Sequence, residues 1–197
     1  MTDSPKPAAQ RPGGRTARVR AQILDATVRL IGRDGITGFR YEEVAELAGV
    51  HRMTVYRNWP DRDALVGEAV LGLAQETAPL RDTGDLRRDL VDFLVALAAG
   101  LVSPTGRALL SAVQAARDNA DVRRTVDEVV TRRVDLLRTR LASATALGEL
   151  PPVDARFLSD LLAGPVHLHV GRDPRPFTRE AAERVVDVVL AGVRATA

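Results

Sequence analysis

The chain has 197 residues, of which 45% are hydrophobic and 27% are charged, so it is long enough to bury a core of its own. It contains no cysteine, which excludes disulfides and thiolate chemistry, and no apolar run approaches the roughly 18 residues that span a bilayer. Residues 1–15 lack the apolar stretch of a secretory signal. We therefore expect a cytoplasmic protein without a membrane partner.

The net charge of +2 is distributed unevenly along the chain. Residues 1–62 carry 11 Lys and Arg against 7 Asp and Glu, whereas residues 63–197 carry 17 against 19. A local basic excess attracts polyanions, chiefly nucleic acid, although a solvated charged surface gives the same signal. The charge pattern alone therefore leaves both interpretations open.

The first third of the chain predicts four helices after a mobile arm. Residues 1–14 contain three prolines and two glycines and are expected to be a disordered basic arm. Apolar residues at helical spacing predict a helix over residues 16–33, which Gly35 should end. A short second helix around Val44 ends at Gly49, and a third contains Val55 and Trp59. Asp61 is placed to cap a fourth helix that runs to about residue 75.

The remainder of the chain predicts five more helices. Leu86 begins the clearest amphipathic pattern, and Ser103 and Pro104 should cap and open the next helix, which runs to about Arg117. A stripe of Val and Leu over residues 122–141 predicts a long helix, and two more are expected over residues 154–170 and 178–194. No strand alternation occurs. The predicted class is therefore all-α with about nine helices.

The last predicted helix has valines on more than one of its sides, at positions 185, 186, 188, 189 and 193. A helix that is apolar on two sides must be buried on two sides. Because terminal helices normally lie at the surface, we expect the second side to meet a partner subunit. The last two helices therefore predict a homodimer.

The third helix combines an apolar side with a side suited to nucleic acid. If Val55 faces the core, a rotation of 100° per residue places Trp59 beside it at i+4. The same rotation turns outward four other residues: Met53, Thr54, Tyr56 and Arg57. Hydroxyl and phenol groups donate to phosphate oxygens, and arginine binds phosphate or a guanine edge. A tight turn at Gly49 before such a helix is typical of a helix-turn-helix that presents one helix to a DNA groove.

The stretch "AGVHRMTVYRNWPDRDALV" resembles the DNA-binding signature of TetR-type transcriptional regulators, and the resemblance covers about residues 16–70. It implies that residues 15–60 form a helix-turn-helix domain and that residues 61–197 form a domain for dimerisation and ligand binding. It also implies a homodimer on a near-palindromic operator in double-stranded DNA, associated with the nucleoid, and a small-molecule inducer that releases it. No cofactor or metal is implied.

The resemblance assigns roles to individual positions. It implies phosphate contacts for three residues: Thr54, Tyr56 and Arg62. It implies that four residues read base edges: Arg52, Met53, Arg57 and Asn58. Three positions depart from the pattern. His51 replaces the usual hydroxyl cap of the third helix, so this cap should be weak or come from elsewhere. Arg40 replaces the hydroxyl cap of the second helix, which leaves that cap in doubt, and is expected near phosphate. Glu42 can face the groove, where it would accept from cytosine or repel the backbone.

The ligand pocket is predicted from apolar positions of the second domain. The candidates are Phe93, Leu97, Leu101, Leu110, Val113, Gln114 and Phe157. For the apolar residues among them, a place in the plain hydrophobic core is the favoured alternative. Gln114 lies within "LLSAVQAA", where a buried amide would need a partner that a ligand could provide. With 4% aromatic residues, the pocket should be mainly aliphatic.

Other functions are less compatible with the sequence. His167 and His169 are about 200° apart on a predicted helix, so they cannot chelate one metal as an i, i+4 pair could. No phosphate loop or nucleophile motif occurs, so we do not expect an enzyme. A DNA-binding protein without small-molecule control, or an activator, remains the alternative to a ligand-responsive repressor.

Overall fold

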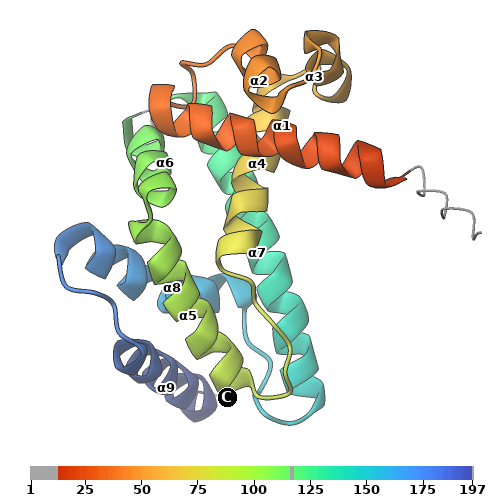
Figure 1. Cartoon of the computed structure of the whole chain (residues 1–197). Coiled ribbons are helices and arrows are strands. Elements are labelled where there is room, and N and C mark those ends of the chain that lie inside the picture. Colours follow the sequence, from red (N-terminus) through yellow and green to blue (C-terminus); the bar gives the residue numbers. More distant parts are fainter. Residues whose placement is uncertain (1–12, 116–117, 197) are drawn as a thin grey trace, which may run out of the picture.

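The computed structural model describes residues 13–115 and 118–196, and this part of the chain contains nine helices and no strand (Figure 1). The helices are α1 (Gly13–Asp34), α2 (Tyr41–Ala48), α3 (Arg52–Asn58), α4 (Arg62–Thr77), α5 (Leu86–Val102), α6 (Pro104–Ala115), α7 (Ala120–Ala146), α8 (Ala155–Arg172) and α9 (Arg179–Ala195). The predicted all-α class is confirmed. The predicted arm lies outside the described residues except for Gly13 and Gly14, which begin α1, and so does the predicted helix end at Arg117.

The helices bury two separate hydrophobic cores. The first core lies among α1, α2, α3 and the first half of α4, and the second lies among α5, α7, α8 and α9. In Figure 1 the three N-terminal helices occupy one end of the molecule, and α9 with the C-terminus lies at the other. We call the elements around the first core the reading unit and those around the second core the body.

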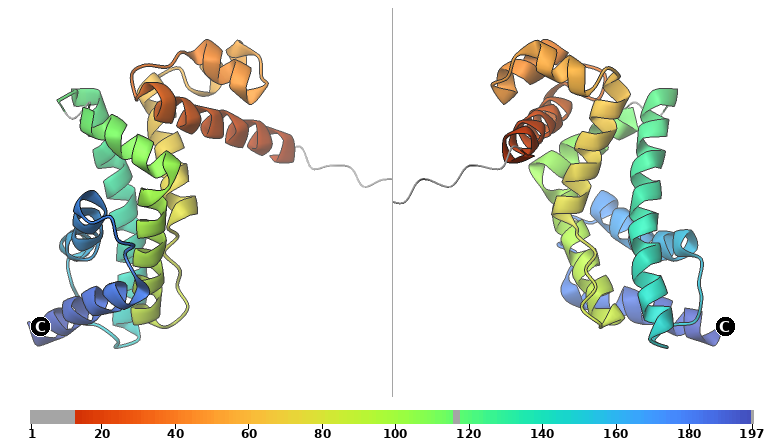
Figure 2. Two further views of the ribbon diagram at one scale, coloured as in Figure 1. Left: turned by 60° about the vertical axis from the view of Figure 1, so that its left-hand side comes forward. Right: turned by 90° about the vertical axis from the view of Figure 1, so that its right-hand side faces the viewer.

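Helix α4 belongs to both parts. Leu65, Val66 and Val70 are buried in the first core, and Ala78, directly after the helix, is buried in the second. Both views of Figure 2 show α4 running from the reading unit into the body. Val126 and Val129 of α7 also pack against the first core, so the body supports the reading unit at a second place. Leu109 and Val113 of α6 add to this contact.

Two of the predicted helix starts depend on side-chain caps. The Asp61 carboxylate accepts from the backbone N–H of Asp63 at 3.1 Å, and the Ser103 hydroxyl accepts from Gly106 N–H at 3.0 Å. Both bonds satisfy a donor that the first turn of a helix leaves unpaired. The two predicted caps are confirmed, and they explain why the sequence locates these helix starts well.

No single helix in the described ranges is long and apolar enough to cross a membrane. Only α5 taken together with Pro104–Ser111 meets the requirement of length and composition, and the two segments are bent by 75°.

A buried ion pair holds α5 to α7 in the body. Arg140 Nε donates to the Asp89 carboxylate at 2.8 Å, and both side chains are almost fully buried. Thr83 donates to the same carboxylate through its backbone N–H and its hydroxyl. Burial by itself would raise the pKa of Asp89, but the bonds from Thr83 and Arg140 prevail and lower it. Asp89 is therefore ionised at neutral pH and neutralises the buried guanidinium.

Replacing Asp89 by Ala should destabilise the protein by about 3 kcal/mol or more, because it leaves Arg140 buried without its main counter-charge. Asp187→Ala is the matched control, since it removes the carboxylate of an exposed pair with Arg87 at 2.6 Å and should cost about 1 kcal/mol or less. Urea unfolding of both variants measures the difference. Equal losses of unfolding free energy would contradict the special role of the buried pair.

Candidate nucleic-acid interface and ligand cavity

The turn between α2 and α3 is fixed by Gly49. Its φ of 66° lies in the left-handed region, which glycine enters without a steric penalty. The backbone N–H of Gly49 donates to Glu46 O at 3.1 Å, and that of Val50 donates to Ala45 O at 2.9 Å. The last carbonyls of α2 thus have hydrogen-bond donors, and α3 begins three residues after Gly49. The predicted turn at Gly49 is confirmed.

Helix α3 has the two sides that the sequence predicts. Val55 and Trp59 are buried in the first core, whereas Met53 is 58% and Tyr56 is 41% exposed. Arg52, Arg57 and Asn58 are also exposed, and Thr54 is half-buried. The Asn58 amide donates to Thr54 O at 2.6 Å and therefore lies back along its own helix. The structure thus brings the predicted contact residues of α3 to one free surface.

His51 caps α3 itself, against the expectation that its cap is weak or comes from elsewhere. Its Nδ1 accepts from the backbone N–H of Met53 at 3.2 Å. A neutral imidazole can do this when the hydrogen is on Nε2, so the ring replaces the oxygen of a serine cap. The departure from the family pattern at this position therefore keeps its structural role.

The start of α2 is capped from inside the helix. Arginine carries no acceptor, so the Arg40 side chain cannot cap α2 as a hydroxyl would. Instead the Glu43 carboxylate accepts from the Arg40 backbone N–H at 2.8 Å and from Arg33 at 2.9 Å. This leaves the exposed guanidinium of Arg40 at the edge of the reading unit, beside the exposed Glu42.

Glu42 and Tyr56 meet on the same surface. The Tyr56 hydroxyl donates to Glu42 Oε1 at 3.3 Å, and its ring packs on that of Tyr41 with centroids 4.7 Å apart. Tyr41 is buried and donates to Trp59 O at 2.9 Å. The Tyr41 ring therefore supports the phenol of Tyr56 from below, and Glu42 lies directly beside the predicted phosphate contact.

Arg62 has partners inside the fold that the sequence did not suggest. One Nη nitrogen donates to Phe39 O at 2.8 Å and to Ile36 O at 3.2 Å. The guanidinium also lies 4.4 Å from the centroid of the Phe39 ring. Arg62 therefore ties the start of α4 to the loop between α1 and α2. A phosphate contact, as predicted, would have to use its other N–H groups.

Glu68 joins three helices of the reading unit. Its carboxylate accepts from Trp59 Nε1 at 2.9 Å and from Arg20 Nε at 2.7 Å. The Arg20 guanidinium lies 4.5 Å from the centroid of the Trp59 indole. Sequence reasoning assigned no role to Arg20 or Glu68. The available signal was Trp59, because a buried indole N–H needs an acceptor.

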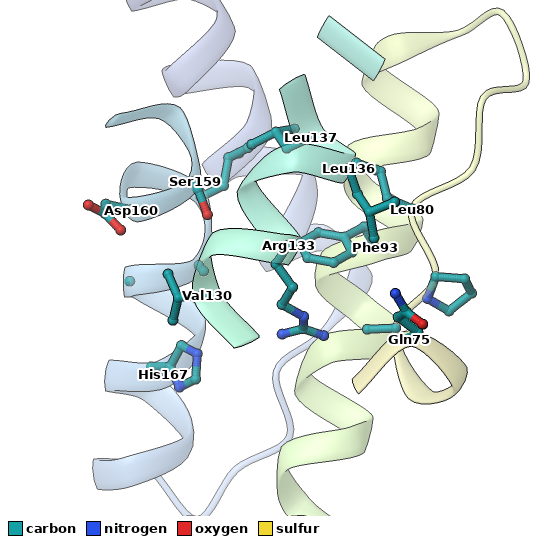
Figure 3. A pocket seen from close by; sticks show the side chains of 15 residues that line it. Gln75, Leu80, Phe93, Val130, Arg133, Leu136, Leu137, Ser159, Asp160 and His167 are labelled. Atoms are coloured by element: carbon teal, nitrogen blue, oxygen red, sulfur yellow. The ribbon is translucent and has the colours of Figure 1, made fainter. Parts of the chain in front are cut away.

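A cavity of about 550 Å³ lies in the body between the end of α4 and helices α5, α7 and α8 (Figure 3). Leucines at positions 80, 136, 137 and 162 contribute to its largely apolar lining, and Gln75, Arg133, Ser159 and His167 bring polar groups to it. The Arg133 guanidinium extends into the space between Gln75 and His167. Burial, with a contribution from Arg133, lowers the pKa of His167, so its imidazole is neutral at neutral pH.

The predicted pocket residues separate into four groups. Phe93 lines the 550 Å³ cavity, and Leu97, Leu101 and Leu110 line a smaller one of about 150 Å³. Val113 packs against the first core instead. Gln114 and Phe157 are exposed, so the expected buried amide at position 114 is wrong. The side of α6 that carries Gln114 faces away from the core, which a short alanine-rich stretch could not reveal.

Comparison with known proteins identifies this architecture. Residues 23–69 match the family described as "Bacterial regulatory proteins, tetR family", and residues 80–189 match "Tetracyclin repressor-like, C-terminal domain". The chain is 31% identical to the HTH-type transcriptional regulator AqdR of Rhodococcus erythropolis over 98% of its own length and 93% of that protein. It is 30% identical to the regulator Rv1556 of Mycobacterium tuberculosis over 86% of its length and 84% of that protein.

Solved structures agree with the sequence comparisons. The crystal structure of the TetR family transcription regulator SCO0332 is 31% identical, covers 89% of this chain and 98% of its own, and superposes with a TM-score of 0.71. The fold and the exposed third helix define a helix-turn-helix transcriptional regulator. The chain belongs to the TetR family, whose members act by binding DNA and not as enzymes.

Arg62→Ala should lower the unfolding free energy by about 2 kcal/mol without any DNA present, because two carbonyls lose a charged donor and Phe39 loses its stacked guanidinium. Arg57→Ala, which removes an exposed arginine from α3, should change it by less than about 0.5 kcal/mol. Chemical unfolding of the free protein compares the two. An unchanged unfolding free energy in Arg62→Ala would contradict the structural role of Arg62.

Proposed function

We propose that the protein is a ligand-responsive repressor that binds a near-palindromic operator as a homodimer and is released by a small molecule. The observation that carries the proposal is the exposed polar side of α3, held at a fixed angle by the Gly49 turn and the buried Val55 and Trp59. A helix presented in this way fits the major groove of a duplex. Operator binding would place the protein on the chromosome.

The residues of this surface divide into two proposed roles. Phosphate contacts are assigned to Arg40, Thr54, Tyr56 and Arg62. Base reading is assigned to Arg52, Met53, Arg57 and Asn58, with Glu42 at the edge of the groove. The bond from the Tyr56 hydroxyl to Glu42 is 3.3 Å long and exposed, so a phosphate oxygen can replace the carboxylate as acceptor. Asn58 has to release Thr54 O before its amide reaches a base.

The homodimer is supported by exposed apolar side chains on the last two helices. Phe157, Leu161 and Leu168 lie on one side of α8, at spacings of four and seven residues, and are 59%, 39% and 54% exposed. Val188 of α9 is 73% exposed, whereas Val186 is buried in the core. Such side chains are normal singly, but their recurrence on α8 fits an interface between two copies.

The small-molecule response is supported by the position of the cavity. Gln75 of α4 and Ala78, just beyond it, line the 550 Å³ cavity, and the same helix buries Leu65 and Val66 in the reading unit. A ligand that moves the end of α4 therefore moves the reading unit, and in a dimer it changes the spacing of the two α3 helices. Because a palindrome is read at fixed spacing, contacts on both half-sites are lost together.

The phosphate and base roles are separable by mutation. An operator is first selected from a random duplex library, and binding is then titrated on this operator and on unrelated DNA. Tyr56→Phe should weaken both by about 1 kcal/mol, the size of one net hydrogen bond. Arg57→Ala should also change which base is preferred at one position of each half-site. Equal losses on both DNAs for Arg57→Ala would assign that residue to phosphate, and failure to select any sequence would contradict operator binding.

The dimer is tested by placing a charge on the proposed interface. The wild type should sediment as a dimer at micromolar concentration, and Val188→Asp should shift it toward the monomer, because an unpaired carboxylate is costly in an apolar contact. Leu147→Asp is the control, since Leu147 is also exposed, at 66%, but lies in the turn after α7. A wild-type monomer, or a Val188→Asp dimer as stable as the wild type, would contradict the proposal.

A further inference from the structure

Arg133 of α7 occupies an unusual position between two cavities. It lines both the 550 Å³ cavity and the smaller one of about 150 Å³. One Nη nitrogen donates to Ala74 O in the last turn of α4 at 3.1 Å, and the guanidinium lies 5.7 Å from the centroid of the Phe93 ring. The charged end of the side chain is thus held at the wall of the larger cavity, where Figure 3 shows it pointing into the open space.

The positive charge of Arg133 has no counter-charge in the described part of the chain, where no carboxylate lies within ion-pair distance of it. Asp160, the one acidic residue of the cavity lining, is exposed and lies 3.5 Å from Arg156. Arg140, which is almost fully buried in α7, is by contrast neutralised by Asp89. Partial burial lowers the pKa of Arg133, as expected for a cation that is partly removed from water and has no counter-charge.

The other polar groups near Arg133 do not supply a negative charge. Gln75 is a neutral amide, and the neutral imidazole of His167 can donate one hydrogen bond. Ser159 of α8 lies farther from Arg133, on the side of the lining where Figure 3 shows Leu137. The rest of the lining is formed mainly by leucines, Phe93 and Ala163. The cavity therefore has a cationic, hydrogen-bonding region at Arg133 and a mainly apolar remainder.

We propose that the effector of this protein is an amphipathic anion, whose single carboxylate or equivalent acidic group binds Arg133 while its apolar part fills the space between Leu80, Leu136 and Leu137. The inference rests on the proposed ligand response and specifies the chemistry of the ligand. A bound anion completes the pairing that Arg133 lacks, and Gln75 and His167 can donate to its second oxygen.

The same contact links the ligand to α4. Ala74 O now accepts from Arg133 and from the backbone N–H of Ala78, the latter at 3.2 Å. An anion competes with the Ala74 carbonyl for the guanidinium, because a charged acceptor forms the stronger hydrogen bond. Binding therefore loosens α7 from the last turn of α4, which is the helix that carries the reading unit.

The test uses three probes with the same ten-carbon tail: decanoate, decanol and decylammonium. Each probe is titrated at neutral pH into the full-length protein with the neutral fluorophore N-phenyl-1-naphthylamine bound, and the displacement of the fluorophore is measured. Decanoate should act at a concentration about tenfold or more below that of decanol, which corresponds to one charge-assisted hydrogen bond, and decylammonium should be the weakest. Arg133→Gln should abolish the preference for decanoate, Arg133→Lys should restore part of it, and Arg138→Gln, which alters an exposed arginine of α7, should leave it unchanged.

A second measurement follows the link to α4. Decanoate should speed amide hydrogen exchange in residues 73–78 of the wild type and not of Arg133→Gln. Equal potency of decanoate and decanol, or a preference that survives Arg133→Gln, would overturn the inference. If decanol then still released the operator, the ligand-responsive function would stand without an anionic effector. If no probe bound, the anionic effector and the ligand-responsive function would both be contradicted. Operator binding is tested separately, by the DNA titration.

Discussion

Helix α4 has to satisfy two hydrophobic cores at once, and the arrangement of the whole molecule depends on this constraint. Its first half is buried with Leu65, Val66 and Val70 among the helices that present α3, and its end delivers Ala78 into the body. The helix cannot shift relative to one core without disturbing the other, because close-packed interiors resist gradual deformation. Glu68 strengthens the attachment of α4 to the reading unit through its bonds with Trp59 and Arg20. Arg133 attaches the end of α4 to the body through its bond to Ala74 O. The two attachments differ in kind. The attachment to the reading unit contains an ion pair of opposite charges, whereas the attachment to the body joins a charged donor to a neutral carbonyl.

Local chemistry explains why the sequence located the helices so well. Gly49, Asp61 and Ser103 act on neighbouring backbone groups, so their effect can be predicted from a few residues. The two sides of α3 follow from helical rotation once Val55 is buried. His51 shows the limit of this reasoning, because its ring accepts a hydrogen bond in place of the expected hydroxyl.

The cavity and the ion pairs depend on residues that are distant in the sequence, and this is why they were not predicted well. Phe93 lines the cavity and Gln114 is exposed, whereas Arg133 and His167 line the cavity without any local signal in the sequence. Asp89 and Arg140 are 51 positions apart, and nothing near either residue marks them as partners. Arg62 was expected to touch phosphate because of its place in the family pattern. Its bonds to Phe39 O and Ile36 O arise only when the loop before α2 folds against α4.

The carboxylate of Glu42 beside Tyr56 also bears on how the protein finds its site among a vast excess of other DNA. Non-specific binding comes almost entirely from phosphate contacts, and a negative charge on the contact surface weakens it for every sequence. In the proposed operator complex, Tyr56 leaves Glu42 for a phosphate oxygen and the carboxylate accepts from a cytosine. The repulsion between the carboxylate and phosphate would therefore weaken binding mainly at non-operator sites. On the proposed DNA-contact surface, an acidic residue at this position would weaken binding to non-operator DNA and so shorten the residence time there.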